Sequence, residues 1–179
     1  VLFFFFFVAN SISGPSRACM LTGKHSHKNG FIDNNHHFDG AQQTFPKLLQ
    51  KAGYQTAVVG KWHLTSNPTG FDYWNILIGQ GDYYNPFFID NGVKKQYTGY
   101  ATNITTELAL DWLGNKRDKN KPFCLLLHHK APHRTWMPDT CDLGMFDDKV
   151  YPLPANFYDK YEGRLAAAQQ EMSIIEDMD

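Results

Sequence analysis

Two short segments rich in apolar residues, each predicted to form a strand, constrain the fold of this chain more than any other feature. Residues 41–53 place apolar side chains at the i, i+3, i+4 and i+7 positions of an amphipathic helix and end in a glycine that suits a helix stop. The first apolar run, residues 54–59, follows at once and predicts a buried strand that ends before Gly60. The second, residues 123–127, follows Pro122 and predicts a central strand.

The segments between and after these runs complete the expected layout. Residues 104–113 predict a second helix, which leads into the second apolar run. Residues 64–100 are rich in glycine, asparagine, tyrosine and aspartate, and residues 134–157 are rich in proline, so both predict long loops. Residues 158–178 are rich in alanine, glutamine, glutamate and methionine and predict a final helix.

Helices that alternate with continuous apolar strands predict an α/β fold with a mostly parallel sheet and helices on both faces. In such sheets the ligand lies beyond the carboxyl ends of the strands. Three polar clusters follow predicted strands in this sequence, at residues 13–17, 61–63 and 128–133. We therefore expect the three clusters to meet on one rim of the sheet.

Composition and the chain ends give no support to several classes of protein. A formal net charge of -1 gives no basic surface of the kind that binds nucleic acid. The apolar run Val1–Ala9 is too short to span a bilayer, which takes about 20 residues, and without a preceding basic residue it is a poor signal peptide. It predicts a buried strand entered partway. Both ends therefore suggest a piece of a longer domain.

The first polar cluster has the features of an anion site. Ser13 follows an apolar segment, and Pro15 suits the first turn of a helix, whose free N–H groups and dipole attract a negative charge. Arg17, one turn further on, is able to bind an oxyanion in a bidentate manner. The alternative is that Ser13 only caps a helix and that Arg17 is a surface residue.

The second cluster combines a fixed charge with a titratable group. Lys61 and His63 lie two residues apart at a strand end, so their side chains point the same way. A lysine supplies positive charge for an anion, and a histidine transfers protons near neutral pH. The alternative is a surface lysine beside a structural histidine.

The eleven residues from Ser13 to Gly23, SGPSRACMLTG, resemble the signature of the type I sulfatases of the alkaline phosphatase superfamily. That resemblance implies that Ser13 is converted after translation to formylglycine (3-oxoalanine), whose hydrate supplies the nucleophilic oxygen. A serine at the first signature position resembles the serine-type, mostly bacterial branch, which is matured by a radical enzyme. The implied class is a sulfuric ester hydrolase.

Two further segments, Gly60–Leu64 and Lys130–His133, resemble the Gly-Lys-Trp-His and Ala-Pro-His segments of the same family. The resemblance implies that Arg17 and Lys61 stabilise developing charge, that His133 protonates the departing alcohol, and that His63 removes a proton to release sulfate. The catalytic residues expected are therefore Ser13, Arg17, Lys61, His63 and His133.

The stretch Leu127–Pro138 resembles the glycosaminoglycan-acting sulfatases, especially those that act on 6-O-sulfated N-acetylglucosamine, as in heparan sulfate. Cationic and aromatic side chains suit a sulfated sugar. The candidate substrate-binding residues are His128, His129, Lys130, Arg134 and Trp136. The alternatives are that His128 and His129 only flank the strand end, that Lys130 is a solvated residue, that Arg134 pairs with a nearby acid, and that Trp136 packs under a loop.

The family resemblance also implies a calcium ion, for which Ser13, as formylglycine, is the one metal-site position present. The family's acidic pair upstream of the nucleophile has no counterpart here, and its second Asp-Asn pair and a further lysine would lie beyond residue 179. We expect residues 1–179 to be part of a single N-terminal catalytic domain and to be weakly active or inactive alone. The resemblance implies a periplasmic or extracellular parent protein.

Two rival functions remain open at this stage. A phosphatase or phosphonate hydrolase of the same superfamily would use Ser13 unmodified. A non-catalytic module that binds sulfated glycans would fit the missing acidic pair.

Overall fold

The computed structural model describes residues 8–169 and residue 177. The chain divides into two units, Val1–Met137 and Pro138–Asp179, which are described separately. In the first unit the described elements are α1 (Ser13–Thr22), α2 (Ser26–Asn29), α3 (Phe45–Lys51), β1 (Gln55–Lys61), β2 (Tyr73–Leu77), β3 (Phe87–Asp90), β4 (Val93–Gln96), α4 (Ala101–Asp111), a π-helical turn (Trp112–Lys116) and β5 (Phe123–His128).

The sheet is mixed, with the strand order β4-β3-β2-β1-β5. Strand β1 pairs in parallel with both β2 and β5, whereas β2–β3 and β3–β4 are antiparallel pairs. The expectation of a mostly parallel sheet is therefore correct for the three strands around β1 and wrong for the β3–β4 hairpin. The hairpin lies in residues 64–100, where the sequence predicted only a loop.

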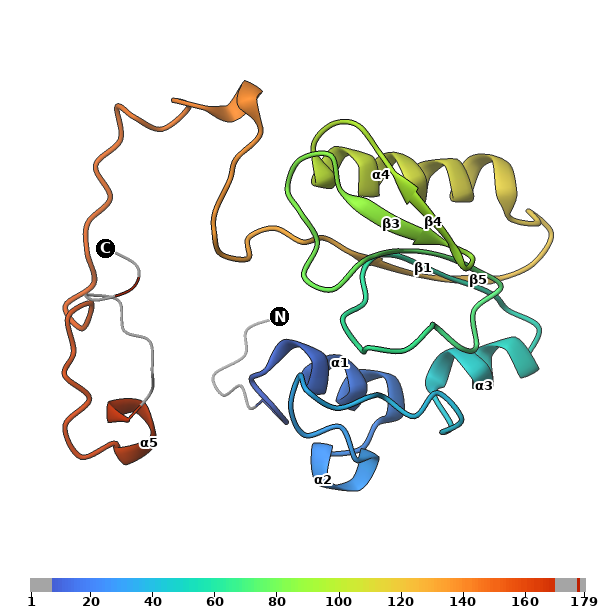
Figure 1. Ribbon diagram of the computed structural model, residues 1–179, viewed down its shortest axis with the longest axis horizontal. Helices are drawn as coiled ribbons and strands as arrows, with labels where there is room; N and C mark the ends of the chain where they lie inside the picture. The colour runs from blue at the N-terminus through green and yellow to red at the C-terminus, as the bar shows by residue number, and fades with distance from the viewer. Residues whose placement is uncertain (1–7, 170–176, 178–179) are drawn as a thin grey trace. The chain divides into compact units, whose positions relative to one another are not determined.

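Helices cover both faces of the sheet, as expected. In Figure 1, α4 lies on one side of the strands, and α1 and α3 lie on the other. Alternate residues of β1 serve the two layers: Ala57 and Val59 pack with Trp112, which follows α4, whereas Val58 packs with Ala18 of α1. This alternation follows from the two-residue period of a strand.

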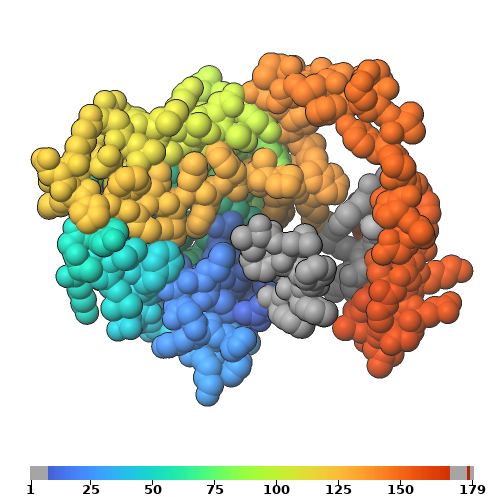
Figure 2. Space-filling view, turned by 180° about the vertical axis from the view of Figure 1, so that it is seen from behind, coloured from blue at the N-terminus to red at the C-terminus, as the bar shows by residue number. Residues whose placement is uncertain are grey.

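Strand β5 is at the edge of the described sheet, not at its centre. Figure 2 shows the segment around β5 at the surface, between the helices of the two layers. Phe123 and Leu127 are accordingly 42% and 40% exposed. The apolar run that predicted a central strand is therefore covered on fewer sides than its composition indicates.

Strand β1 extends past the predicted break at Gly60. Gly60 pairs with Ile76 and His128 and has a φ of 100°. A Cβ atom there would lie 2.0 Å from the main-chain oxygen of His128. The glycine is needed because the neighbouring strand approaches so closely, and it does not end the strand.

The second unit contains a 3₁₀ turn at Thr140–Asp142 and a short helix, α5 (Leu165–Ala168). The irregular course of residues 143–157 agrees with the expected loop. Residues 158–164 are not helical, so the predicted helix begins later than expected, and most of its remainder lies outside the described residues, as does most of the predicted first strand. Among the helices that the structure describes, none has the length and apolarity needed to cross a bilayer.

Candidate active site

Ser13 is the first residue of α1, and its hydroxyl faces a histidine. The preceding residue, Ile12, is extended and gives the helix no side-chain cap, so Ser13 is not itself the cap. Ser13 Oγ lies 2.7 Å from Nδ1 of His63, a hydrogen bond between residues 50 positions apart. A partly buried hydroxyl beside a helix start and an imidazole is a position at which a nucleophile can be activated.

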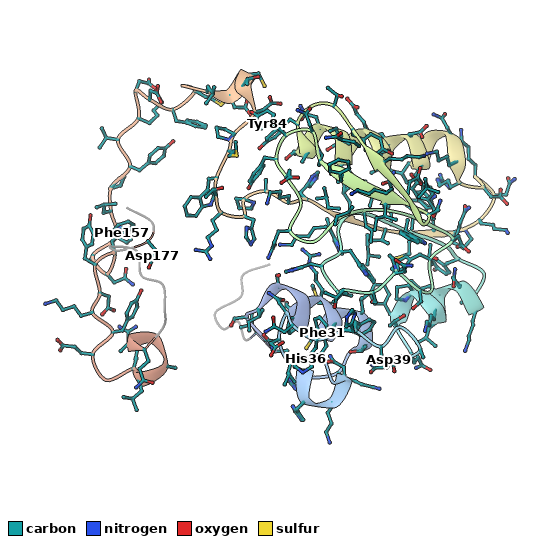
Figure 3. All side chains as sticks on the ribbon, in the orientation of Figure 1. Phe31, His36, Asp39, Tyr84, Phe157 and Asp177 are labelled. Atoms are coloured by element: carbon teal, nitrogen blue, oxygen red, sulfur yellow. The ribbon has the colours of Figure 1, made fainter. Side chains whose placement is uncertain are left out.

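Gly14 allows the start of α1 to pack tightly. A Cβ atom on Gly14 would lie 2.7 Å from Asn34 Oδ1, 2.8 Å from a ring carbon of Phe31 and 2.9 Å from the His63 main-chain oxygen. Figure 3 labels Phe31 beside α1. The Gly14 N–H donates to Asn34 Oδ1 at 3.1 Å. The close approach fixes the backbone at Ser13 without a side chain at the next position.

Arg17 is half-buried and joins two strands to α1. Its Nη1 donates to the Lys61 main-chain oxygen at 3.0 Å and lies 2.9 Å from His128 Nδ1. Burial lowers the pKa of Arg17, but a guanidinium stays charged at neutral pH. The surface-residue alternative is therefore wrong, and Arg17 hydrogen-bonds to neutral acceptors that leave its charge uncompensated.

Lys61 is the last residue of β1 and is 3% exposed. Its ammonium donates to Gln80 Oε1 at 2.5 Å. Burial first, and then the positive charges of Arg17 and Lys130, lower the pKa of Lys61 to about 8. The surface-lysine alternative is wrong.

His63 lies near two site cations and close enough to His133 for the charge of His133 to act on it. Burial, followed by Lys61, Arg17 and His133, lowers the pKa of His63, so the imidazole is neutral at neutral pH. His133 follows a turn in which its N–H donates to the Lys130 main-chain oxygen at 3.1 Å. The Tyr83 hydroxyl donates to the His133 main-chain oxygen at 2.5 Å, and the ring of His133 contacts the Arg134 main-chain oxygen.

His128 and Lys130, expected to bind substrate, are both held inside the site. Burial, then Arg17, lowers the pKa of His128 to about 4, and its Nδ1 lies close to Arg17 and to the Lys61 main-chain oxygen. Lys130 is 8% exposed, and its ammonium lies 4.6 Å above the ring of Tyr83. His128 therefore contacts Arg17 rather than an open surface.

The remaining predicted residues lie apart from these contacts. His129 Nδ1 is buried and has no hydrogen-bond partner in the described part of the chain. Trp136 is 55% exposed and Arg134 is exposed, and Arg134 forms no ion pair with a described residue. The alternatives of an acid-paired Arg134 and a loop-covered Trp136 find no support among the described residues.

Sequence reasoning missed Gln80 and Tyr83, which contact three of the predicted residues. The available signal was the pair of glycines around Gln80, Gly79 and Gly81, which have positive φ values of 58° and 73°. Glycines that flank a polar residue at a strand end indicate a backbone held in a special conformation.

The site residues fit the two expected non-protein groups differently. Ser13, at a helix start with a neighbouring imidazole, lies where a nucleophilic oxygen can be activated, which is compatible with formylglycine at that position. Among the described residues, no group of three or more histidine, cysteine, aspartate or glutamate side chains could hold a metal ion. Calcium needs several oxygen ligands, and no such group of described side chains supplies them.

A cavity of about 440 Å³ opens beside the second polar cluster, residues 61–63. His63 and Trp62 line it from the end of β1, and Ile78 and Gly79 line it from the end of β2. Since the carboxyl ends of parallel strands meet at one edge, this cavity and the polar clusters share the predicted rim.

The profile of the sulfatase family matches residues 1–174. The chain belongs to the sulfatase family. Among its relatives, the N-acetylglucosamine-6-O-sulfatase of Bacteroides thetaiotaomicron is 59% identical over 172 residues, which cover 94% of this sulfatase chain and 31% of the relative. Human N-acetylgalactosamine-6-sulfatase is 40% identical, over 98% of this chain and 41% of its own length.

Solved structures show the same kinship. The structure of BT4656 in complex with its substrate D-glucosamine-2-N,6-O-disulfate aligns with a TM-score of 0.91 and 58% identity, over 97% of this chain and 36% of that one. Ps i-CgsB in complex with a neocarrahexaose aligns with a TM-score of 0.73 and 26% identity, over 80% of this chain and 40% of that one. The sulfatase chain spans about a third of the length of the curated relatives it matches.

Proposed function

We propose that the protein containing this chain hydrolyses sulfate esters of sulfated glycans, with the 6-O-sulfate of N-acetylglucosamine, as in heparan sulfate, as its target. The observation that carries the proposal is the 2.7 Å contact between Ser13, the first residue of α1, and His63. It lies beside three buried or half-buried cations, Arg17, Lys61 and Lys130. A nucleophile position, a proton acceptor and an anion site are thereby combined.

The net reaction exchanges the sulfate ester for an alcohol and inorganic sulfate, with water as the second reactant. Formylglycine formed from Ser13 would supply, as its hydrate, the oxygen that attacks sulfur. Arg17 and Lys61 stabilise the negative charge on the sulfate oxygens. His133 donates a proton to the departing alcohol oxygen, and His63, neutral at working pH because its pKa is lowered, accepts a proton as sulfate leaves.

The named relatives support a sugar substrate. The relative that is 59% identical is an N-acetylglucosamine-6-O-sulfatase, and the structure of BT4656 holds a glucosamine disulfate as its substrate. Arg134 and Trp136 are exposed and therefore free to contact a sugar. A guanidinium and an aromatic ring suit a sulfated pyranose.

The remaining partners follow from family membership. A radical maturase converts Ser13, calcium is held with acidic residues outside the described set, and the periplasm or the extracellular space is the working location. Lys130 and His128, which contact Gln80 and Arg17, belong to this anion site, and His129 stays a candidate for contact with the sugar.

The first experiment tests the nucleophile. The full-length protein is produced with and without a serine-type maturase, and the peptide containing Ser13 is weighed by mass spectrometry. Conversion removes about two mass units from Ser13 and leaves Ser16 unchanged. An intact Ser13 in a fully active enzyme would refute the formylglycine mechanism and favour the phosphatase alternative.

The second experiment tests the substrate. The matured enzyme is assayed on heparan and chondroitin fragments and on an aryl sulfate. The glycan assignment is wrong if the aryl sulfate is cleaved far better than every glycan. If a glycan is preferred but Arg134→Ala and Trp136→Ala leave its kcat and KM unchanged, these two residues do not recognise the sugar.

A further inference from the structure

Gln80 lies where three segments of the site meet. It follows β2, whose last residue, Leu77, pairs in register with Lys61 at the end of β1. A turn closed by the Gly81 N–H on the Ile78 main-chain oxygen, at 3.0 Å, holds the Gln80 backbone. The positive φ of Gly79 and the close approach of Gly81 to the Leu77 side chain require glycine on both sides of Gln80.

The side-chain oxygen and the main-chain oxygen of Gln80 each accept a hydrogen bond from a lysine. Its side-chain Oε1 accepts a hydrogen bond from the Lys61 ammonium at 2.5 Å. Its main-chain oxygen accepts one from the Lys130 ammonium at 3.3 Å. Lys61 and Lys130 are only 3% and 8% exposed. These acceptors, rather than water, therefore set the directions of the two ammonium groups.

The surroundings of Lys61 explain why a neutral acceptor matters. The charged and titratable groups that act on or are affected by Lys61 are Arg17 on α1, His63 just after β1, and Lys130 after β5. No described carboxylate forms an ion pair with Lys61. An aspartate or glutamate at the position of Gln80 would orient the ammonium equally well but would cancel its field at the sulfate.

We propose that Gln80 is a positioning residue of the sulfate site, which orients the Lys61 and Lys130 ammonium groups through its two oxygens without adding a negative charge beside either of them. The proposal rests on the proposed function, since the sulfate ester is the anion that the two lysines face. Gln80 acts through the lysines and has no chemical step of its own.

Two near-isosteric variants of the full-length, matured enzyme separate orientation from charge. Gln80→Met removes the side-chain acceptor, and Gln80→Glu keeps an acceptor but adds a negative charge. Each lowers kcat/KM for a sulfated glucosamine by about 10- to 100-fold, the range expected for a hydrogen bond to a charged group. The control is Gln96→Glu, the same charge change at an exposed amide on β4 that donates to the Asn85 main-chain oxygen, and it leaves kcat/KM unchanged.

The pH profile distinguishes this role from a general structural defect. Activity falls on the alkaline side as Lys61, with its pKa near 8, loses its charge. Gln80→Met removes an interaction that favours the charged ammonium, so the alkaline limb moves to lower pH. Gln80→Glu adds an opposite charge, so the limb moves to higher pH. A lesion that merely disturbs the fold would not move the limb in opposite directions.

A measurement without turnover keeps the inference independent of the proposed function. The ¹³Cε resonance of Lys61, assigned with a Lys61→Arg variant, is titrated in the wild-type, Gln80→Met and Gln80→Glu proteins. Midpoints in the order Met, wild type, Glu, from low to high pH, support the positioning role even if no sulfate ester is hydrolysed, an outcome that would refute the proposed function alone. Equal midpoints in all three proteins overturn the inference even if the wild type is an active sulfatase.

Discussion

The Tyr83 hydroxyl holds the main chain of the residue expected to protonate the leaving group. Tyr83 is 5% exposed, and its hydroxyl donates to the His133 main-chain oxygen at 2.5 Å. Burial, then Tyr100, raises the pKa of Tyr83, so the donor is present throughout the neutral range. The ring separately stacks on Tyr100 and lies under Lys130. Tyr83→Phe therefore removes the donor and keeps the packing.

The size of the effect follows from the value of one hydrogen bond. A single hydrogen bond between uncharged groups contributes about 0.5–1.5 kcal/mol, which corresponds to a change of about 2- to 12-fold in rate if it is lost in the transition state. Because the contact acts on the position of His133, the loss is expected in the step that protonates the departing alcohol. Under the proposed function we expect this step to matter most for a sugar sulfate, whose leaving alkoxide is strongly basic.

The assay compares two leaving groups. With the matured full-length enzyme, Tyr83→Phe lowers kcat for N-acetylglucosamine-6-sulfate by about 2- to 12-fold. The kcat for nitrophenyl sulfate, whose leaving group departs without a proton, changes by less than about 2-fold. Tyr97→Phe is the matched control, since the Tyr97 hydroxyl accepts a hydrogen bond from Asn75 Nδ2 at 2.9 Å and does not contact His133.

Equal losses on both substrates would refute the reasoning, because they would show a general defect of the site rather than a misplaced acid. No loss on either substrate would show that the hydrogen bond does not position His133. A Tyr97→Phe variant with the same leaving-group selectivity would contradict the assignment to Tyr83.

Two other changes have defined outcomes. Gly60→Ala places a Cβ atom 2.0 Å from the His128 main-chain oxygen and is expected to lower the free energy of unfolding, measured in urea, by about 3 kcal/mol or more. The control Gly114→Ala, at a position with open space, changes the free energy of unfolding by less than about 1 kcal/mol. Equal effects of the two variants would exclude the steric explanation. Inorganic sulfate raises the melting temperature more at about pH 7 than at about pH 9.5, because Lys61 is charged below its pKa of about 8. The difference between the two pH values is expected to disappear when chloride at matched ionic strength replaces sulfate, and also in the Lys61→Met variant. An equal rise in melting temperature at both pH values would refute the role of Lys61.

The sequence predicted the local elements of the site well because short-range patterns determine them. The start of α1 at Ser13 follows from the strand-like entry and Pro15, and β1 and β5 follow from their apolar runs. The shared rim also follows, because the parallel pairing of β1 and β5 brings Gly60 opposite His128. These inferences need only helix and strand periodicity and the handedness of parallel connections.

The β3–β4 hairpin could have been predicted and was not. Its turn contains Asn91-Gly92, and both residues have positive φ values, 43° and 94°. An Asn-Gly pair between two extended runs is the strongest short-range signal of a hairpin. The abundance of glycine, asparagine and tyrosine around it was interpreted as a loop, so composition outweighed the turn signal.

Other contacts have no local signal at all. Arg17 and His128 are 111 positions apart, and Tyr83 and His133 are 50 apart. Which histidine contacts Arg17, and which tyrosine supports His133, depends on how the layers pack. The prediction that His128 contacts the substrate was made from its place in the chain and stays a prediction. The 2.9 Å contact of its Nδ1 with Arg17 Nη1 depends on packing and has no signal in the local sequence.

The partners of the site cations indicate how the binding of an anion would affect the stability of the fold. Buried charges are ordinarily stabilised by opposite charges. Here Arg17 hydrogen-bonds to a main-chain oxygen and an imidazole, and Lys61 to an amide, all of them neutral. Only Lys130, among these three, has a described carboxylate acting on its pKa, that of Asp82. Burying these positive charges therefore destabilises the folded site as long as no anion is bound. An anion that binds there would offset the unfavourable burial energy and would thereby stabilise the fold.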